Sequence, residues 1–149
     1  MNDQEVRTRL GVADLLARYQ FLVDAGKVRQ VAQLFTEDAV FANNTAEVVG
    51  PDGVLGFFMA TKDSFLSAGF LPGRHHLSTV LVQPREDGSA STYACFQFVG
   101  TRGLDHWGTY RDEVVPVGDG YAFARREATI EGCVPGSPVL SLLGLTGPP

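Results

Sequence analysis

The sequence lacks several features that would assign it to a specialised class of protein. It has only two cysteines in 149 residues, Cys95 and Cys133, and both lie in apolar, strand-like surroundings where a buried thiol acts as a small hydrophobic side chain. The N-terminus is charged from its third residue and offers no apolar core for a signal peptide. No window reaches the roughly 18 to 20 apolar residues of a membrane span. We therefore expect a cytoplasmic protein without a membrane partner.

Positive charge is also scarce. Lys and Arg number 12 against 17 Asp and Glu, which gives a net charge of −5, and the basic residues form no cluster. An acidic protein repels phosphate backbones, so the sequence predicts no nucleic-acid partner.

Motifs for cofactors, metals and activated nucleophiles are missing as well. The phosphate-cradling motifs GxxxxGK and GxGxxG do not occur, and no serine lies in a nucleophile elbow. The sequence also has no HExxH, no CxxC and no compact group of His and carboxylate residues. These absences argue against kinases, dehydrogenases, serine hydrolases and metalloenzymes. We expect no metal and no cofactor.

Helical patterns occupy the first half of the chain. Residues 4–25 predict an amphipathic helix, residues 28–35 a shorter one and residues 51–65 a third. A strand is predicted over residues 39–42, and the polar residues 43–50 indicate a loop. The buried stripe of the first helix is predicted to contain Val12, Leu16, Tyr19 and Val23.

After residue 73 the spacing of apolar residues changes from near 3.6 to 2, which is typical of strands. The segment Gly118-Asp119-Gly120 is a strong hairpin signal. Helices followed by hairpin-connected strands predict an α+β fold, a curved and mainly antiparallel sheet forming a cone with three N-terminal helices. The predicted strands cover residues 74–83, 89–101, 105–117 and 121–132.

We expect one domain over residues 1–133, followed by a Pro/Gly-punctuated apolar tail over residues 134–149. A mobile tail is one interpretation, but it would expose several leucines to water. We therefore favour packing over the cone or against a second subunit. These leucines are Leu140, Leu142, Leu143 and Leu145.

Tyr19 and Asp24 are the first candidate site residues. A buried Tyr19 needs a hydrogen-bond partner, since an unsatisfied buried polar group costs about 1 to 3 kcal/mol, and a backbone carbonyl is the structural alternative. Asp24 follows an apolar run and lies in the last turn of its helix, where the dipole opposes a carboxylate. Both effects favour the protonated carboxyl, which suits an acid/base group. A solvated carboxylate before Gly26 is the alternative.

His75 and His76 are adjacent on a predicted strand, so their side chains point to opposite faces. A histidine that faces Asp24 across a cavity would form an acid/base dyad with it. Tyr110 and Asp112 alternate onto one face of a later strand, and aspartate is disfavoured in strands. Asp112 is therefore either exposed or buried for a purpose. Further candidates are Trp107, His106 and Arg126.

Several segments, in this order, resemble the SnoaL-like branch of the NTF2-like superfamily. They are RYQFLVDAGKVRQVAQLFTEDAVF, PDGVLGFF, RHHLSTVLV and GTYRDEVVPVGDGYAFARR, and the resemblance covers roughly residues 5–132. It implies a cone-shaped α+β barrel with an internal pocket, often in dimers. Enzymes of this superfamily include scytalone dehydratase, bile-acid dehydratase, ketosteroid isomerase and polyketide cyclases.

The resemblance also implies roles for individual residues. The pocket Tyr and Asp of the two dehydratases match Tyr19 and Asp24, and their catalytic His matches His75, or His76 with a shift of one residue. We prefer His75. The general base of ketosteroid isomerase falls on Asn43, an amide that cannot take a proton, which argues against that chemistry in its usual form.

The sequence therefore predicts a cofactor-independent lyase or isomerase that acts on a hydrophobic cyclic or polyketide-like substrate, in a homodimer. Asp24 and His75 would move a proton from carbon to a leaving hydroxyl, while Tyr19 polarises a carbonyl. Two alternatives stay open: a non-catalytic protein that binds a small ligand, and an accessory subunit like the small subunits of ring-hydroxylating oxygenases. The predicted substrate-binding residues are His76, Tyr110, Asp112, Trp107, Asn43 and Phe58.

Overall fold

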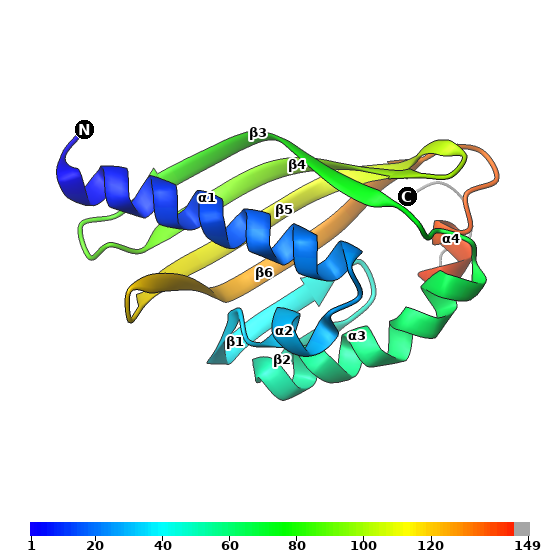
Figure 1. Ribbon diagram of the computed structural model, residues 1–149, viewed down its shortest axis with the longest axis horizontal. Helices are drawn as coiled ribbons and strands as arrows, with labels where there is room; N and C mark the ends of the chain where they lie inside the picture. Colours follow the sequence, from blue (N-terminus) through cyan, green and yellow to red (C-terminus); the bar gives the residue numbers. More distant parts are fainter. Residues whose placement is uncertain (145–149) are drawn as a thin grey trace.

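The computed structural model of the protein describes residues 1–144 (Figure 1). The elements follow one another as α1 (Asp3–Asp24), α2 (Val28–Ala32), β1 (Phe35–Asn43), β2 (Glu47–Val49), α3 (Gly50–Ser67), β3 (Arg74–Pro84), β4 (Ala90–Gly100), β5 (Gly103–Val117), β6 (Gly120–Cys133) and α4 (Val139–Leu142). The predicted α+β architecture is confirmed.

A six-stranded curved sheet is the centre of the fold, in the order β2-β1-β6-β5-β4-β3 (Figure 1). The long strands β3 to β6 form an antiparallel meander, and β1 pairs parallel to β6 and antiparallel to β2. Helix α1 runs across one face of the sheet, and α2 and α3 lie beside its lower edge in Figure 1. The hydrophobic core lies between this face and the helices.

Helix α1 begins with a capping box. The Asn2 side chain accepts a hydrogen bond from the backbone N–H of Glu5 at 2.9 Å, and the Glu5 carboxylate accepts one from the backbone N–H of Asn2 at 3.0 Å. On the predicted stripe, Val12, Leu16 and Tyr19 are buried against the sheet. Among the described residues, no helix is both long enough and apolar enough to cross a membrane.

The chain between α1 and α3 differs from the prediction. The second helix ends at Ala32 and not at residue 35, and β1 begins at Phe35 and not at residue 39. The reason is tertiary. Phe35 pairs with Phe123 of β6, their ring centroids are 5.1 Å apart, and the Phe123 N–H donates to Leu34 O at 2.9 Å. This parallel pairing overrides the local helical pattern. The predicted loop 43–50 likewise contains the short strand β2.

The described part of the C-terminal tail packs against the domain. Val139 of α4 is fully buried in a small cluster with Phe70 and Phe98. The Ser137 hydroxyl donates to Asp105 Oδ2 at 2.7 Å, which ties the tail to the start of β5. The partly buried leucines that join this cluster are Leu140, Leu142 and Leu143. Leu145, the other leucine of the predicted tail, lies outside the described residues.

Candidate active site

The end of α1 meets the start of β3 at two of the predicted site residues. His75 Nδ1 lies 2.7 Å from Asp24 Oδ1, and the backbone N–H of His75 donates to Asp24 Oδ2 at 3.1 Å. Both side chains are largely buried, with exposed fractions of 15% for His75 and 8% for Asp24. The carboxylate therefore fixes both the position and the ring orientation of the histidine. With the Nδ1 proton on this contact, Nε2 of the neutral imidazole carries the free lone pair.

His75 points into the core side of the sheet, and its neighbour His76 is exposed. The alternation of strand side chains produces this difference. The His75 ring lies 4.8 Å from the Phe98 ring and 5.8 Å from the Phe96 ring, between centroids. His76 is therefore outside the site that contains Asp24.

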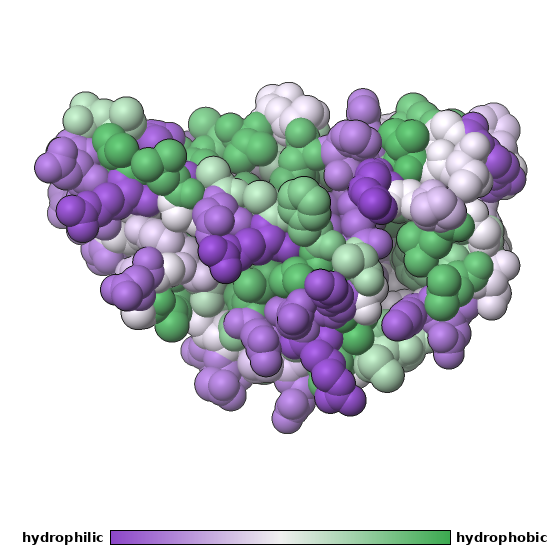
Figure 2. Space-filling view, viewed as in Figure 1, coloured by the Kyte–Doolittle hydropathy of each residue, from purple (hydrophilic) through white to green (hydrophobic). Residues whose placement is uncertain are grey.

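A groove of about 300 Å³ runs between α1 and β3 beside His75. Figure 2 shows hydrophobic side chains on the molecular surface where these two elements meet. A β-bulge between Ser78 and Leu81, with Thr79 at a φ of +53°, shifts the alternation of β3 and lets Val80 line the groove. The groove is lined by Ala13, Leu16, Ala17, Gln20, Phe21, His75, Leu77 and Val80. Asp24 does not line the groove. It affects the groove by holding the ring of His75 in place.

His106 forms a second histidine–aspartate pair beside the first. Its Nδ1 lies 2.8 Å from Asp105 Oδ2, and its ring stacks on Phe98 with 5.0 Å between centroids. The His106 ring is 6.3 Å from the His75 ring. Burial lowers the pKa of His106, the bond to Asp105 opposes this effect, and a charged His75 would lower it further. His106 is therefore held as a neutral imidazole behind His75.

Arg126 lies at the centre of the core with no exposed surface. Its guanidinium carbon is 3.9 Å from the ring centroids of both Tyr19 and Tyr110, so the cation is held between two aromatic faces. None of its three side-chain nitrogens has a hydrogen-bond partner within the described part of the chain. Tyr19 therefore belongs to a buried cation–aromatic stack and does not line the groove.

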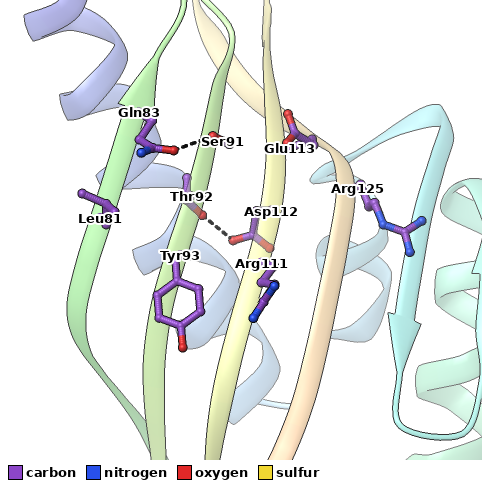
Figure 3. A pocket seen from close by; sticks show the side chains of 9 residues that line it. All are labelled: Leu81, Gln83, Ser91, Thr92, Tyr93, Arg111, Asp112, Glu113 and Arg125. Atoms are coloured by element: carbon purple, nitrogen blue, oxygen red, sulfur yellow. Dashed lines mark hydrogen bonds between the residues drawn. The ribbon is translucent and has the colours of Figure 1, made fainter.

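Asp112 is the charged partner of this arginine. Arg126 Nη1 lies 3.5 Å from Asp112 Oδ2, which also accepts a hydrogen bond from the Thr92 hydroxyl at 2.9 Å (Figure 3). Burial raises the pKa of Asp112 and of Tyr19, and the Arg126 charge opposes it in both. Burial likewise raises the pKa of Tyr110 to about 12, against the opposing charge of Arg126. Both phenols are therefore held protonated. The sequence predicted that Asp112 is either exposed or buried for a purpose, and the structure shows that it is buried.

Three other predicted substrate-binding residues lie away from the groove. Asn43 Oδ1 accepts hydrogen bonds from the backbone N–H groups of Thr45 and Ala46 at 3.0 and 2.8 Å, which makes Asn43 part of the turn into β2. Phe58 packs in the core, 6.4 Å from Tyr19 between ring centroids. Trp107 is 38% exposed on the opposite face of the sheet, because strand alternation turns it outward when its neighbour His106 points inward.

Gln20 and Asp105 lie at the site although the sequence did not predict them. A signal existed for Gln20, because it follows Leu16 at i+4 and so shares the inward side of α1. Asp105 is adjacent to His106 in the sequence, but spacing alone does not show that its carboxylate turns toward the histidine ring and accepts from Ser137.

The face of the sheet that points away from the helices carries a second depression of about 350 Å³ (Figure 3). It crosses β3 to β6 and does not include Asp24 or His75. Its lining residues are Leu81, Gln83, Ser91, Thr92, Tyr93, Arg111, Asp112, Glu113 and Arg125. Within residues 1–144, no group of three or more His, Cys, Asp and Glu side chains is arranged to hold a metal ion.

Comparisons with solved structures support the fold. An NTF2-like protein with a cystatin-like fold from Novosphingobium aromaticivorans superimposes with a TM-score of 0.72 at 21% identity, over 93% of this chain and 89% of that one. A candidate scytalone dehydratase from the same organism gives a TM-score of 0.71 at 20% identity, over 87% of this chain and 88% of that one. A candidate aromatic ring hydroxylase, also from N. aromaticivorans, gives a TM-score of 0.70 at 26% identity, over 93% of this chain and 97% of that one.

Comparisons of sequence identify the family. No curated protein matches the chain. Residues 4–127, which include nearly all of α1, the Asp24–His75 pair and most of the sheet, match the family described as the SnoaL-like domain. Because this match covers most of the 149 residues, the chain belongs to the SnoaL-like domain family.

Proposed function

We propose that the protein is a cofactor-independent lyase or isomerase of dehydratase type, with Asp24 and His75 as its acid/base dyad. The observation that carries this proposal is the 2.7 Å contact between His75 Nδ1 and Asp24 Oδ1, made by a histidine that also lines a groove. The similarity to a candidate scytalone dehydratase is in keeping with a lyase.

The reaction that suits this arrangement is removal of a proton next to a carbonyl, followed by loss of a hydroxyl group. His75 Nε2 takes the proton from carbon, and the C–H electron pair is held as an enolate of the neighbouring carbonyl. As the carbonyl re-forms, this electron pair forms the new C=C bond and the C–O bond breaks. The departing oxygen takes the proton from the imidazolium, so that water leaves and the histidine is neutral again. Asp24 keeps the ring oriented and stabilises the transient positive charge.

The groove favours a small and largely apolar substrate. Six of its eight lining residues have apolar side chains, and its volume of about 300 Å³ lies at the lower end of the range for ligand sites. A hydrophobic cyclic or polyketide-like compound fits this description. Tyr19, Tyr110 and Arg126 lie behind the groove, so we propose that they support its wall and leave proton transfer to the dyad.

Exchange of carbon-bound protons tests the proposal without knowledge of the natural substrate. The parent protein is mixed with 1-indanone in deuterated buffer, and exchange of the protons next to the carbonyl is followed by NMR. We expect catalysed exchange by the parent, and a loss of about 100-fold or more in the variants His75→Asn and Asp24→Asn. Parent protein that exchanges no faster than buffer would contradict the proposal.

His76→Asn is the matched control. It makes the same change one residue away, on the exposed side of β3, and should retain the exchange rate of the parent. Equal losses in His75→Asn and His76→Asn would indicate damage to the strand rather than loss of a catalytic base.

A non-catalytic ligand-binding protein or accessory subunit is the second candidate. The observation that favours it is the filled interior, where Arg126, Tyr19 and Tyr110 occupy the space behind the groove. Such a protein would bind an apolar ring compound and release it unchanged. Protein that binds 1-indanone in the groove, yet exchanges its protons no faster than buffer, would favour this reading.

A further inference from the structure

Helix α1 carries a second apolar stripe, here called the outer stripe, on the side that points away from the sheet. Two of its members are large and mostly exposed, Phe21 at 78% and Leu10 at 67%. A surface helix usually turns one apolar side to the core and a polar side to water, so a helix that is apolar on both sides is expected to be covered on both. The members of the outer stripe recur every three or four residues, and all are exposed: Val6, Leu10, Ala13, Ala17 and Phe21.

The outer stripe continues across the groove onto the edge of the sheet. Strand β3 lies at one edge, and its Val80 is 45% exposed. Val80 lines the groove together with Ala13, Ala17 and Phe21 of the outer stripe. The hydrophobic side chains where α1 and β3 meet are visible in Figure 2. The apolar surface therefore spans two elements and includes the mouth of the groove beside His75.

The charges beside the outer stripe are arranged symmetrically along α1. Asp14 and Arg18 border the stripe, with side chains that are 60% and 66% exposed. They lie at equal distances on either side of Leu16, and the two large members of the stripe, Leu10 and Phe21, lie nearly so. A two-fold axis at the middle of the helix would therefore place each large apolar residue opposite the other one of a second copy, and each charge opposite an unlike charge.

A second copy of this chain is the partner that this symmetry fits. A two-fold interface uses the same patch on both subunits, so the patch must complement itself in shape and in charge. In an antiparallel pair, Asp14 faces Arg18 of the partner subunit, whereas a parallel pair in register would place like charges opposite each other. Ala13 and Ala17 near the centre let the two helices approach closely. An anionic partner such as a phospholipid surface is disfavoured by the net charge of −5.

We propose that the protein is a homodimer in which α1 packs antiparallel against α1 of a second copy, and that the second copy closes the groove beside His75. Ala13, Ala17 and Phe21 belong to both the outer stripe and the groove, so a helix on the stripe lies over the mouth of the groove. The interface itself is independent of catalysis. The role of the second copy as a groove wall, which keeps water from His75, rests on the proposed function.

Sedimentation velocity of the parent and of Leu10→Glu tests the interface. Leu10 lies on the outer stripe but does not line the groove, so this change leaves the groove intact. We expect a dimeric parent and a dimer dissociation constant about 100-fold or more higher in the variant, because each dimer would bury two of these leucines. Leu66→Glu is the matched control at a 49% exposed position of α3 and should remain dimeric.

Charge reversal tests the antiparallel arrangement. Asp14→Arg and Arg18→Asp each place like charges opposite one another in their own dimers, and each should weaken the dimer about tenfold. Mixing the two variants should restore a mixed dimer of parent affinity, because every facing pair is then unlike. Loss of the contact between Asp14 and Arg18 within one helix cannot produce this rescue, since neither variant regains it on mixing.

The interface is wrong if the parent is monomeric, if Leu10→Glu dimerises as well as Leu66→Glu, or if mixing the two charge variants restores nothing. Failure of the proposed function looks different. A dimer that passes these tests but does not exchange the protons of 1-indanone supports the interface and contradicts catalysis. With a catalytic parent, we expect exchange by Leu10→Glu to fall with its fraction of dimer. Full exchange by a monomeric Leu10→Glu would contradict the role of the second copy as a groove wall.

Discussion

Arg126 is a cation with no exposed surface in the interior of the protein. A guanidinium with no exposed surface loses its hydration, which costs free energy. Contacts with two aromatic faces and with Asp112, which lies 3.5 Å away and is equally buried, offset this cost. A pair of this kind adds little stability over an apolar pair of the same size, but breaking it leaves one charge buried alone. The arginine thus fixes where Tyr19 and Tyr110 lie, and through them the wall behind the groove.

Arg126→Met should therefore destabilise the protein strongly, by about 3 to 5 kcal/mol in urea unfolding. Arg125→Met, the adjacent change on the same strand, removes a side chain that is 41% exposed and should cost less than about 1 kcal/mol. The double variant Arg126→Met, Asp112→Asn should be more stable than the sum of the two single losses implies, because neither charge is then left alone. Strictly additive losses would show that the two residues are not a pair.

His106 should make stability depend on pH. Its folded pKa lies below the ordinary value of 6.5, so between the two pKa values the unfolded chain binds a proton that the folded protein does not. The free energy of unfolding should accordingly fall as pH drops from about 7 through the folded pKa. The charged and titratable groups that face His106 are Asp105 on its own strand and His75 on β3.

The test compares urea unfolding of the parent and of His106→Gln at several pH values between 7.5 and 4.5. Glutamine retains a donor for Asp105 and cannot titrate, so the variant should lose less stability than the parent over this range. Equal losses in the two proteins would assign the pH dependence to other groups.

At the scale of elements, the irregularities of the strands decide which side chains reach the site. The bulge in β3 turns Val80 into the groove, and a register shift between β5 and β6 at Trp107 and Gly108 lies next to the inward His106. Gly108 is needed there because a Cβ on it would lie far inside van der Waals contact with the backbone of Thr129 and Ile130. The same few residues therefore set the register of the strands and decide which side chains reach the site.

Gly108→Ala should destabilise the protein by roughly 1 to 3 kcal/mol, the usual cost of overpacking, because β6 must shift to admit the methyl group. Gly56→Ala is the matched control. Gly56 is an exposed position of α3 with open space around it, so the same change should stabilise the protein by up to about 1 kcal/mol. Thermal unfolding of both variants measures the difference, and equal effects of the same sign would contradict the argument.

At the scale of the molecule, the C-terminal segment closes the end of the core next to the two histidines. The Ser137 hydroxyl donates to Asp105 Oδ2, the acceptor that also contacts His106, and it accepts from the backbone N–H of Val139. Residue Val139 is fully buried with Phe70 and Phe98, and Phe98 is also in contact with His75. The tail is therefore part of the structure that surrounds the site.

Ser137→Ala should loosen this segment. Loss of two hydrogen bonds at a buried position should lower the free energy of unfolding by about 1 to 3 kcal/mol and speed proteolytic cleavage within residues 134–144. Ser141→Ala removes a hydroxyl that is exposed and bonded only locally to Pro138, so this control should match the parent. Identical cleavage of the two variants would mean that the tail is held by its apolar contacts alone.

Local patterns determined most of the fold. The helical spacing of α1, the alternation in β3 to β6 and the Gly118-Asp119-Gly120 turn each express a preference that acts within a few residues, so the α+β architecture could be predicted from them. Residues 35–38 could not, because their strand conformation comes from parallel pairing with β6, a contact across most of the chain. The family resemblance was confirmed by the match over residues 4–127.

For the site, the sequence by itself determined which residue types were available. It also determined that the two adjacent histidines face opposite sides of a strand. Only the tertiary structure decided that His75 meets Asp24 at 2.7 Å, that Gln20 shares its groove, and that Trp107 and Asn43 lie elsewhere. The physical reason is that a site is a set of distances between segments far apart in the chain. Those distances depend on strand register, bulges and core packing, which no single segment encodes alone.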